Sequence, residues 1–534
     1  MNDIQQKILN FDIKSYLILK LKKADPLFWS AFFTSLIALS IVFLYHSTFF
    51  MFGDHDWQYL RHNVKLEAGL FEGRFSQFLF INILSLGKIL PIINNLLGFT
   101  GFSLGIALLA KYWSLPRTQT HYILFALFTT LTPYILSFMY FSFIVIPCLS
   151  WNAVIILSLL ISSSETSFLL KKTISSALLF MLALGGYPPV INLYATALST
   201  KIFLNLFYDN KSLKNIIKDY KYSIINFLLG AILYKLALLY FTHTGAINES
   251  YYNLQIIPLN EWADKFILIS KDIFKQFIIT LPFITSPYKA FTLIITLCAI
   301  YALLSQLINK NKKNKTLSII CFIAIFYSAL ITLFLSPSIK ETEFSPRIDF
   351  FGLLYVYSAM LTITLKSTNK ILKNISYTCI ALCLMVNINS LSNAQKVWNL
   401  GFNAELSLYK RIQNRFKSSN RFNPNGKYII VQGGGPSFRE RFYHTPYTHP
   451  SDDLLSISYI PGMNSGVMFN YYTYPEFADK TSYVYTFRED IEAKKFLQTA
   501  KPWPSENSTM VGDYWIMLIL DNQSLNILKQ NYLR

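Results

Sequence analysis

The sequence predicts a mainly α fold: a polytopic bundle of about eleven transmembrane helices, followed by a soluble C-terminal α+β domain. First, 53% of the 534 residues are hydrophobic and only 14% are charged, whereas soluble proteins carry about 25% charged residues. Second, apolar runs recur as far as Leu391, each about long enough to cross a ~30 Å hydrocarbon layer as a helix. Third, glycine, proline, asparagine and charged residues become frequent from Ser392 onward.

The distribution of positive charge predicts the orientation of the spans. The formal net charge is +19, but the lysines form short clusters between apolar runs and no basic stripe along one helix. This pattern argues against nucleic-acid binding and is typical of cytoplasmic loops in membrane proteins. Lys14, Lys20, Lys22 and Lys23 precede the first apolar run, so we expect a cytoplasmic N-terminus and an uncleaved first helix.

Basic clusters on alternate sides then order the predicted spans and leave the C-terminal tail outside. The segment before Trp113 is too long for one span, so we expect an interfacial piece before Pro91. A break at Gly185 to Pro189 divides another long segment into two short helices. The predicted spans are Leu27 to Phe50, Phe78 to Trp113, Tyr122 to Phe141, Phe143 to Ser163, two within Thr173 to Phe207, Ser223 to Thr242, Phe291 to Ile308, Leu317 to Leu335, Phe350 to Leu365 and Ile375 to Leu391.

The chain therefore divides into a transmembrane domain, residues 1–391, and an extracytoplasmic soluble domain, residues 392–534. Within the second, Lys427 to Val431 and Tyr514 to Leu520 read as buried strands, and Ala404 to Phe416 has a helical pattern. Gly433 to Pro436 follows the first strand, but no lysine-threonine pair comes after it. A nucleotide phosphate loop is therefore disfavoured there.

Four polar elements fall on the external side in this topology. They are the loop around Asp54, the Gly185 to Pro189 break, the Thr242 to Lys289 connection and the Ser336 to Arg347 segment. The third contains an amphipathic stretch, Glu261 to Phe277, with lysines among aromatic residues, which suits the headgroup zone. Ionisable groups beside hydrocarbon are costly unless they face water or a polar ligand. One aqueous site that draws on all four elements is thus expected.

Several short motifs in these elements suggest a family. They are the acids Asp54 and Asp56 after the first helix, a nearby arginine at Arg61, the Gly73-Arg74 step taken to open the next helix, Gly185-Gly186-Tyr187 in mid-chain, and the late external Arg347. In order and spacing, over about the first 390 residues, this arrangement resembles the bacterial GtrII-type glucosyltransferases of the GT-C superfamily. Two features depart from the family pattern: His55 separates the two acids, and Pro188 follows Tyr187.

The resemblance implies a GT-C-like glycosyltransferase in the bacterial inner membrane. Such an enzyme moves a sugar, glucose in this family, from a polyprenyl-phosphate donor to a surface glycan such as O-antigen, modifying lipopolysaccharide on the extracytoplasmic side. The partners it implies are the lipid-linked donor, a glycan acceptor and membrane lipid, with no nucleic acid.

The residue chemistry suits that reaction. Asp54 or Asp56 can accept the proton of the acceptor hydroxyl, and Arg74 and Arg347 can bind the donor phosphate in a bidentate manner. Arg61, Trp57, Tyr187 and Glu72 are the expected substrate-binding residues.

Other readings remain open from the sequence. The acids could belong to a solvated loop, and the arginines could be interfacial anchors. His55 and His62 lie seven residues apart near carboxylates and could bind a divalent metal, but the sequence shows no third ligand and makes no cofactor certain. A lipid-linked-saccharide transporter or flippase is the main alternative, but the sequence shows no internal repeat, which such proteins commonly carry.

Reporter fusions test the predicted topology. A reporter inserted at Lys313 should be cytoplasmic, because that loop is strongly basic, and one fused to the C-terminus should be extracytoplasmic. The measurement uses two reporter enzymes, one active only in the cytoplasm and the other active only outside it. If both fusions report the same side, the number of spans between them is wrong by an odd number.

Overall fold

The computed structural model describes most of the chain outside its first 24 residues. The described ranges are residues 25–48, 63–139, 145–163, 169–246, 261–278, 284–308, 315–332, 351–426, 428–433, 478–480 and 490–533.

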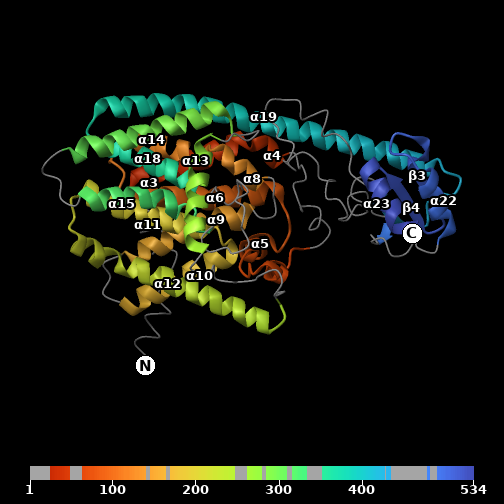
Figure 1. Cartoon of the computed structure of the whole chain (residues 1–534), viewed down its shortest axis with the longest axis horizontal. Helices are drawn as coiled ribbons and strands as arrows, with labels where there is room; N and C mark the ends of the chain where they lie inside the picture. Colours follow the sequence, from red (N-terminus) through yellow and green to blue (C-terminus); the bar gives the residue numbers. More distant parts are fainter. Residues whose placement is uncertain are drawn as a thin grey trace.

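Helices account for nearly all of the regular structure up to residue 417. They are α3 (Pro26–Val42), α4 (Leu44–Thr48), η2 (Leu66–Glu72), α5 (Leu79–Ser85), α6 (Pro91–Tyr112), α7 (Gln119–Thr130), η3 (Pro133–Ile135), α8 (Leu136–Met139), α9 (Val145–Ser162), α10 (Leu169–Gly186), α11 (Val190–Phe207), α12 (Leu213–His243), α13 (Trp262–Ile278), α14 (Ser286–Leu307), α15 (Lys315–Ser328), α18 (Leu353–Lys366) and α19 (Lys370–Lys417). Of these, α14, α15 and α19 lie roughly along one direction while α13 crosses them (Figure 1).

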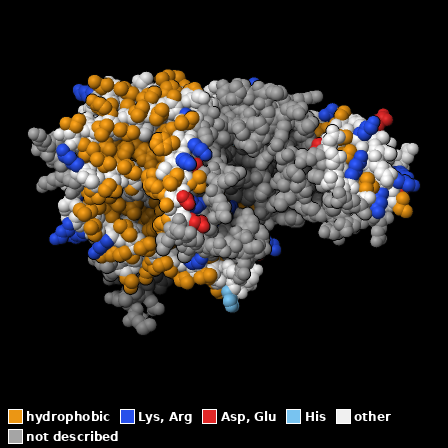
Figure 2. Space-filling view, viewed as in Figure 1, with side chains coloured by type: hydrophobic (Ala, Val, Ile, Leu, Met, Phe, Trp, Pro, Cys, Tyr) orange, Lys and Arg blue, Asp and Glu red, His pale blue; other side chains and the backbone are white. Residues whose placement is uncertain are grey.

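The mainly helical membrane fold predicted from the sequence is confirmed. Among the described residues, six helices are long and apolar enough to cross a membrane, and four shorter helices are also apolar. Each of the predicted spans contains a helix, while the total of about eleven crossings stays a prediction. Figure 2 shows hydrophobic side chains covering much of the visible face of this bundle, with Lys and Arg at the end away from the C-terminal sheet and further charged side chains toward the other end.

Two predicted interruptions are present. The short helix α5 precedes α6, which begins at Pro91. Helix α10 ends at Gly186 and α11 begins at Val190, because the consecutive prolines Pro188 and Pro189 cannot continue the hydrogen-bond ladder of α10.

Close packing of α6 on α9 forms the centre of the bundle. Gly98 and Gly105 lie on one side of α6, and a Cβ atom at either would come 2.7 Å from a side-chain carbon of Val145 or Asn152. The two backbones can approach only because these positions lack a side chain. The core around them is continuous and includes Trp151, which is 1% exposed.

Helix α19 is longer than the sequence pattern indicated. It runs unbroken for 48 residues across the change of composition at Ser392 and includes the stretch expected as a separate helix from Ala404. No proline lies between Lys370 and Lys417. The second half of α19 is more polar than the first, but nothing in it ends the helix.

A small sheet follows α19 at the far end of the molecule (Figure 1). Its strand order is β2-β1-β4-β3, with β1 (Tyr428–Gly433) parallel to β2 (Ala478–Lys480) and to β4 (Trp515–Ile519), and β3 (Thr509–Val511) antiparallel to β4. The helices here are α22 (Ile491–Thr499), η7 (Glu506–Ser508) and α23 (Asn522–Tyr532). Residues 434–436 of the glycine-rich loop lie outside the described residues.

Arg415 joins the end of α19 to this C-terminal unit. Its guanidinium lies 4.2 Å from the ring centroid of Trp503 and donates to the carbonyl of Ser505 at 2.7 Å. Stacking and a charge-assisted hydrogen bond together favour one orientation of the sheet on the helix.

Candidate functional site

Two of the predicted site residues, Arg74 and Tyr187, lie within the described residues with their side chains, and the structure brings them together. The Cζ atom of Arg74 lies 5.4 Å from the ring centroid of Tyr187, although the two residues are 113 positions apart in the sequence (187 − 74). Tyr187 is 5% exposed and Arg74 is half-buried. A guanidinium at this distance from an aromatic face is attracted by the ring quadrupole.

The remaining predicted residues are not placed. Asp54, Asp56, Trp57 and Arg61 fall in residues 49–62, and Arg347 falls in 333–350, all outside the described residues. For Glu72 the structure describes the backbone within η2 but not the side chain.

The Gly73-Arg74 step closes a helix instead of opening one, contrary to the sequence-based expectation. Gly73 is the C-cap of η2 with φ 67°, in the left-handed region that favours glycine. The amide of Arg74 donates to the carbonyl of Gly69 at 2.8 Å, and α5 begins only at Leu79. The tight turn directs Arg74 back toward the α10–α11 break.

Residues after Arg74 attach this turn to the end of α10. The Ser76 amide donates to the Gly185 carbonyl at 3.0 Å, and the Ser76 hydroxyl donates to the Leu182 carbonyl at 2.5 Å. A Cβ atom on Gly185 would come 2.5 Å from the ring of Phe75. The absence of a side chain at Gly185 therefore lets the Arg74 turn lie directly on the helix end.

The second glycine of the break receives another aromatic side chain. A Cβ atom on Gly186 would overlap the indole of the buried Trp151 in α9. Gly185 and Gly186 thus accept a ring each, Phe75 from one side and Trp151 from the other, and Tyr187 follows them directly. This packing fixes where the Tyr187 ring lies relative to Arg74.

Beyond Tyr187 the aromatic surface continues into two other elements. The Tyr187 ring lies 6.0 Å from Phe138 of α8 and 5.5 Å from Phe351, and these two phenylalanines are 5.5 Å apart. We call Tyr187, Phe138 and Phe351 the aromatic cluster. Phe351 is the first described residue after the segment that contains Arg347, and the cluster joins the α10–α11 break to α8 and to the start of the segment before α18.

A buried cation that the sequence analysis did not select lies one helical turn away. Lys289, in the first turn of α14, is 3% exposed. Its ammonium donates to the Tyr134 hydroxyl at 2.9 Å and lies 5.5 Å from that ring centroid. Tyr134 precedes Phe138 by four residues in the continuous η3–α8 turn. The Lys289 ammonium therefore contacts the same η3–α8 segment that supplies Phe138 to the aromatic cluster.

Helix α13 carries a buried carboxylate and packs on α14 and α15. Asp272 is 6% exposed and is the one buried Asp or Glu among the described residues, while Phe274 on the opposite face is 72% exposed. Phe277 of α13 lies 5.8 Å from Tyr357, which in turn is 6.3 Å from Tyr288 beside Lys289. The predicted amphipathic helix is thus present, with a buried face that includes charge.

The sequence contained weak signals for these residues. Lys289 stands alone just before an apolar run and directly after Pro287 and Tyr288, where a lysine more often anchors a helix end. Asp272 lies among alternating charged and aromatic residues, so its burial depends on which face of α13 meets α14 and α15. Only tertiary packing distinguishes that face from the solvated one.

This arrangement suits an anionic ligand with a ring. A guanidinium can bind a phosphate through two parallel hydrogen bonds, and aromatic faces offer apolar surface to a sugar ring. Among the described residues no group of three His, Cys, Asp or Glu side chains could hold a metal ion, and His55 and His62 lie outside them.

Comparison with known proteins gives one match. The family described as Glucosyl transferase GtrII matches residues 55–363, more than half of the chain. The matched range contains Arg74, Tyr187 and the aromatic cluster. No curated protein and no solved structure matches.

The packing of Gly186 on Trp151 generates a stability prediction. Replacing Gly186 by Ala should lower the free energy of unfolding of the purified protein by about 1–3 kcal/mol, because the added methyl group overpacks the core. The same change in a Trp151→Leu background should cost much less, since the indole is gone. Unfolding followed by intrinsic fluorescence in detergent provides both values. If Gly186→Ala lowered the free energy of unfolding equally in the wild-type and Trp151→Leu backgrounds, contact with the Trp151 indole would not be the reason for a glycine at this position.

Proposed function

The chain belongs to the GtrII glucosyltransferase family, and we propose that it transfers glucose from a polyprenyl-phosphate donor to a surface glycan such as O-antigen. In this proposal the protein lies in the bacterial inner membrane with a cytoplasmic N-terminus. The reaction and the C-terminal unit are then on the extracytoplasmic side. The observation that carries the proposal is the contact between Arg74 and Tyr187 in the α10–α11 break.

A lipid-linked phosphosugar requires a cation at headgroup depth and a surface for the sugar. Arg74 supplies a guanidinium in a turn between helices of the bundle, half-buried beside a ring. In such partly desolvated surroundings a charge-assisted contact to phosphate is stronger than in bulk water. The isoprenoid chain would remain in the bilayer while the phosphate reaches Arg74.

The proposed chemistry is a single displacement at the anomeric carbon. The acceptor hydroxyl oxygen forms a bond to C1 of glucose, the bond from C1 to the phosphate oxygen breaks, and its electron pair stays on the phosphate. Asp54 or Asp56 takes the hydroxyl proton. Arg74 and Arg347 stabilise the negative charge that develops on the departing polyprenyl phosphate.

Further residues shape the site in this proposal. Trp57, Arg61 and Glu72 contact the substrates, and Tyr187 orients Arg74 and presents its ring to the sugar. Arg347 precedes Phe351 by four residues in the sequence, and Phe351 contacts Tyr187. That proximity supports the assignment of both arginines to one phosphate.

Neutral replacements of the two acids test the base assignment. Asp54→Asn or Asp56→Asn should reduce glucosylation of the surface glycan by about 10²-fold or more, because general-base catalysis typically contributes 10²–10⁴-fold. Glycan mass analysis of a host with each variant gives the measurement, and immunoblotting of membranes controls for protein abundance. Unchanged glucosylation in both variants would rule out a catalytic role for either acid.

Substitutions at Tyr187 separate the ring from its hydroxyl. Tyr187→Phe should retain near wild-type transfer, since the ring that contacts Arg74 remains, whereas Tyr187→Leu should lose about 2- to 30-fold, as expected for a cation–π contact of ~0.5–2 kcal/mol. Initial rates in isolated membranes with a polyprenyl-phosphate glucose donor provide the comparison. A Phe variant as impaired as the Leu variant would contradict the orienting role of the ring.

A further inference from the structure

A groove separate from the Arg74 site runs along the surface between α3 and α7. Its volume is about 650 Å³, within the ~300–1,000 Å³ range of ligand pockets. The residues that line it are Pro26, Trp29, Ser30, Phe33, Thr34, Ile37, Ala38, Gln119, Ile123 and Leu127.

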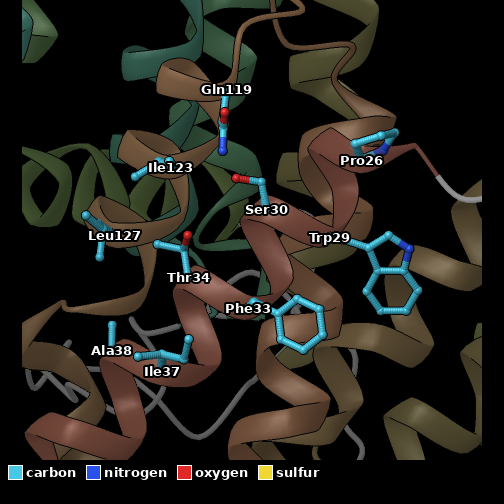
Figure 3. A pocket seen from close by; sticks show the side chains of 10 residues that line it. All are labelled: Pro26, Trp29, Ser30, Phe33, Thr34, Ile37, Ala38, Gln119, Ile123 and Leu127. Carbon is cyan, nitrogen blue, oxygen red and sulfur yellow. The ribbon is translucent and has the colours of Figure 1, made fainter.

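The groove has two apolar walls and a floor of small side chains (Figure 3). Trp29 and Phe33 of α3 form one wall, where the Trp29 and Phe33 rings stack with centroids 5.7 Å apart. Ile123 and Leu127 of α7 stand on the other side. Between the walls lie Ser30, Thr34 and Ala38, spaced by four residues and therefore on one face of α3. The groove stays open because the side chains of Ser30, Thr34 and Ala38 are too short to fill the gap between α3 and α7.

The length of the groove matches one leaflet of a bilayer. From Pro26 to Ala38 the helix rises about 18 Å at 1.5 Å per residue, close to the ~15 Å that half of a ~30 Å hydrocarbon layer provides. A helix of a second protein copy would need contact over the whole layer. The dimensions therefore favour a single lipid chain over a docked helix.

The polar end of the groove carries charge suited to a headgroup. Helices α3 and α7 both begin there, so both positive helix ends point the same way. Arg117 lies just before α7, has a side chain that is 84% exposed, and forms an ion pair with Asp25 at 3.4 Å. Asp25 also caps α3 by accepting from the Leu27 amide at 3.0 Å. The exposed guanidinium retains donors for a second anion, since an arginine has five.

We propose that this groove binds one acyl chain of an anionic phospholipid, with the lipid phosphate against Arg117. The chain lies on Ser30, Thr34 and Ala38 between the two apolar walls. The site lies in the leaflet that surrounds the beginning of α3, and it is independent of glucosyl transfer because it does not involve Arg74 or Tyr187. Its role is to hold the first helix against α7.

Fluorescence quenching in nanodiscs tests the proposal on the full chain. Nanodiscs contain either phosphatidylglycerol or phosphatidylcholine with brominated acyl chains, and the Trp29 signal is the difference between the wild-type protein and Trp29→Phe. Brominated phosphatidylglycerol should quench Trp29 with about fivefold higher apparent affinity than brominated phosphatidylcholine, as expected for one arginine at a membrane surface. Arg117→Gln should remove this preference and leave quenching itself in place.

A second pair of variants tests the groove. Thr34→Phe or Ala38→Phe should fill it and lower Trp29 quenching at least twofold, whereas Ile232→Phe on the exposed face of α12, 55% exposed in the wild type, should have no effect. Equal quenching by both lipids in the wild-type protein would show only unselective surrounding lipid and overturn the proposal. Weak quenching together with dimers in nanodiscs of both lipids would also overturn it, since a second copy would then cover the groove.

Discussion

The candidate site depends on two consecutive glycines that have no room for a side chain. Gly185 lies under the ring of Phe75 and Gly186 under the indole of Trp151. Because both rings pack against these glycines, the turn that contains Arg74 lies close enough to the end of α10 to form hydrogen bonds through Ser76. Tyr187 follows the two glycines, and its ring contacts the Arg74 guanidinium. Backbone packing in the core thereby sets the position of the Arg74 guanidinium on the α10–α11 break.

Much of this organisation follows from sequence patterns that have a direct physical cause. Apolar runs of membrane length must form helices, since a lipid environment leaves no other partner for backbone N–H and C=O groups, and a helix is present in each run. Two prolines end α10, as expected. The motifs containing Arg74 and Tyr187 are recognisable in the sequence alone, and the family match includes both.

What the sequence could not reveal depends on contacts between distant elements. The Gly73-Arg74 step reads equally well as the start or the end of a helix, and only the left-handed conformation of Gly73 decides between them. Lys289 resembles an interfacial anchor until Tyr134 is placed beside it. In α19, the change to polar residues at Ser392 suggests an end to the helix, yet the helix continues to Lys417 because no proline interrupts it.

The proposed function requires that Arg74, held over Tyr187, binds the donor phosphate. An electron cryomicroscopy structure of the full chain with a non-hydrolysable polyprenyl-phosphonate glucose analogue would locate that phosphate. We expect phosphonate density within hydrogen-bonding distance of the Arg74 guanidinium, with the sugar ring at the aromatic cluster of Tyr187, Phe138 and Phe351. Phosphonate density elsewhere in the bundle, with Arg74 still on Tyr187 and free of ligand, would contradict the proposed function.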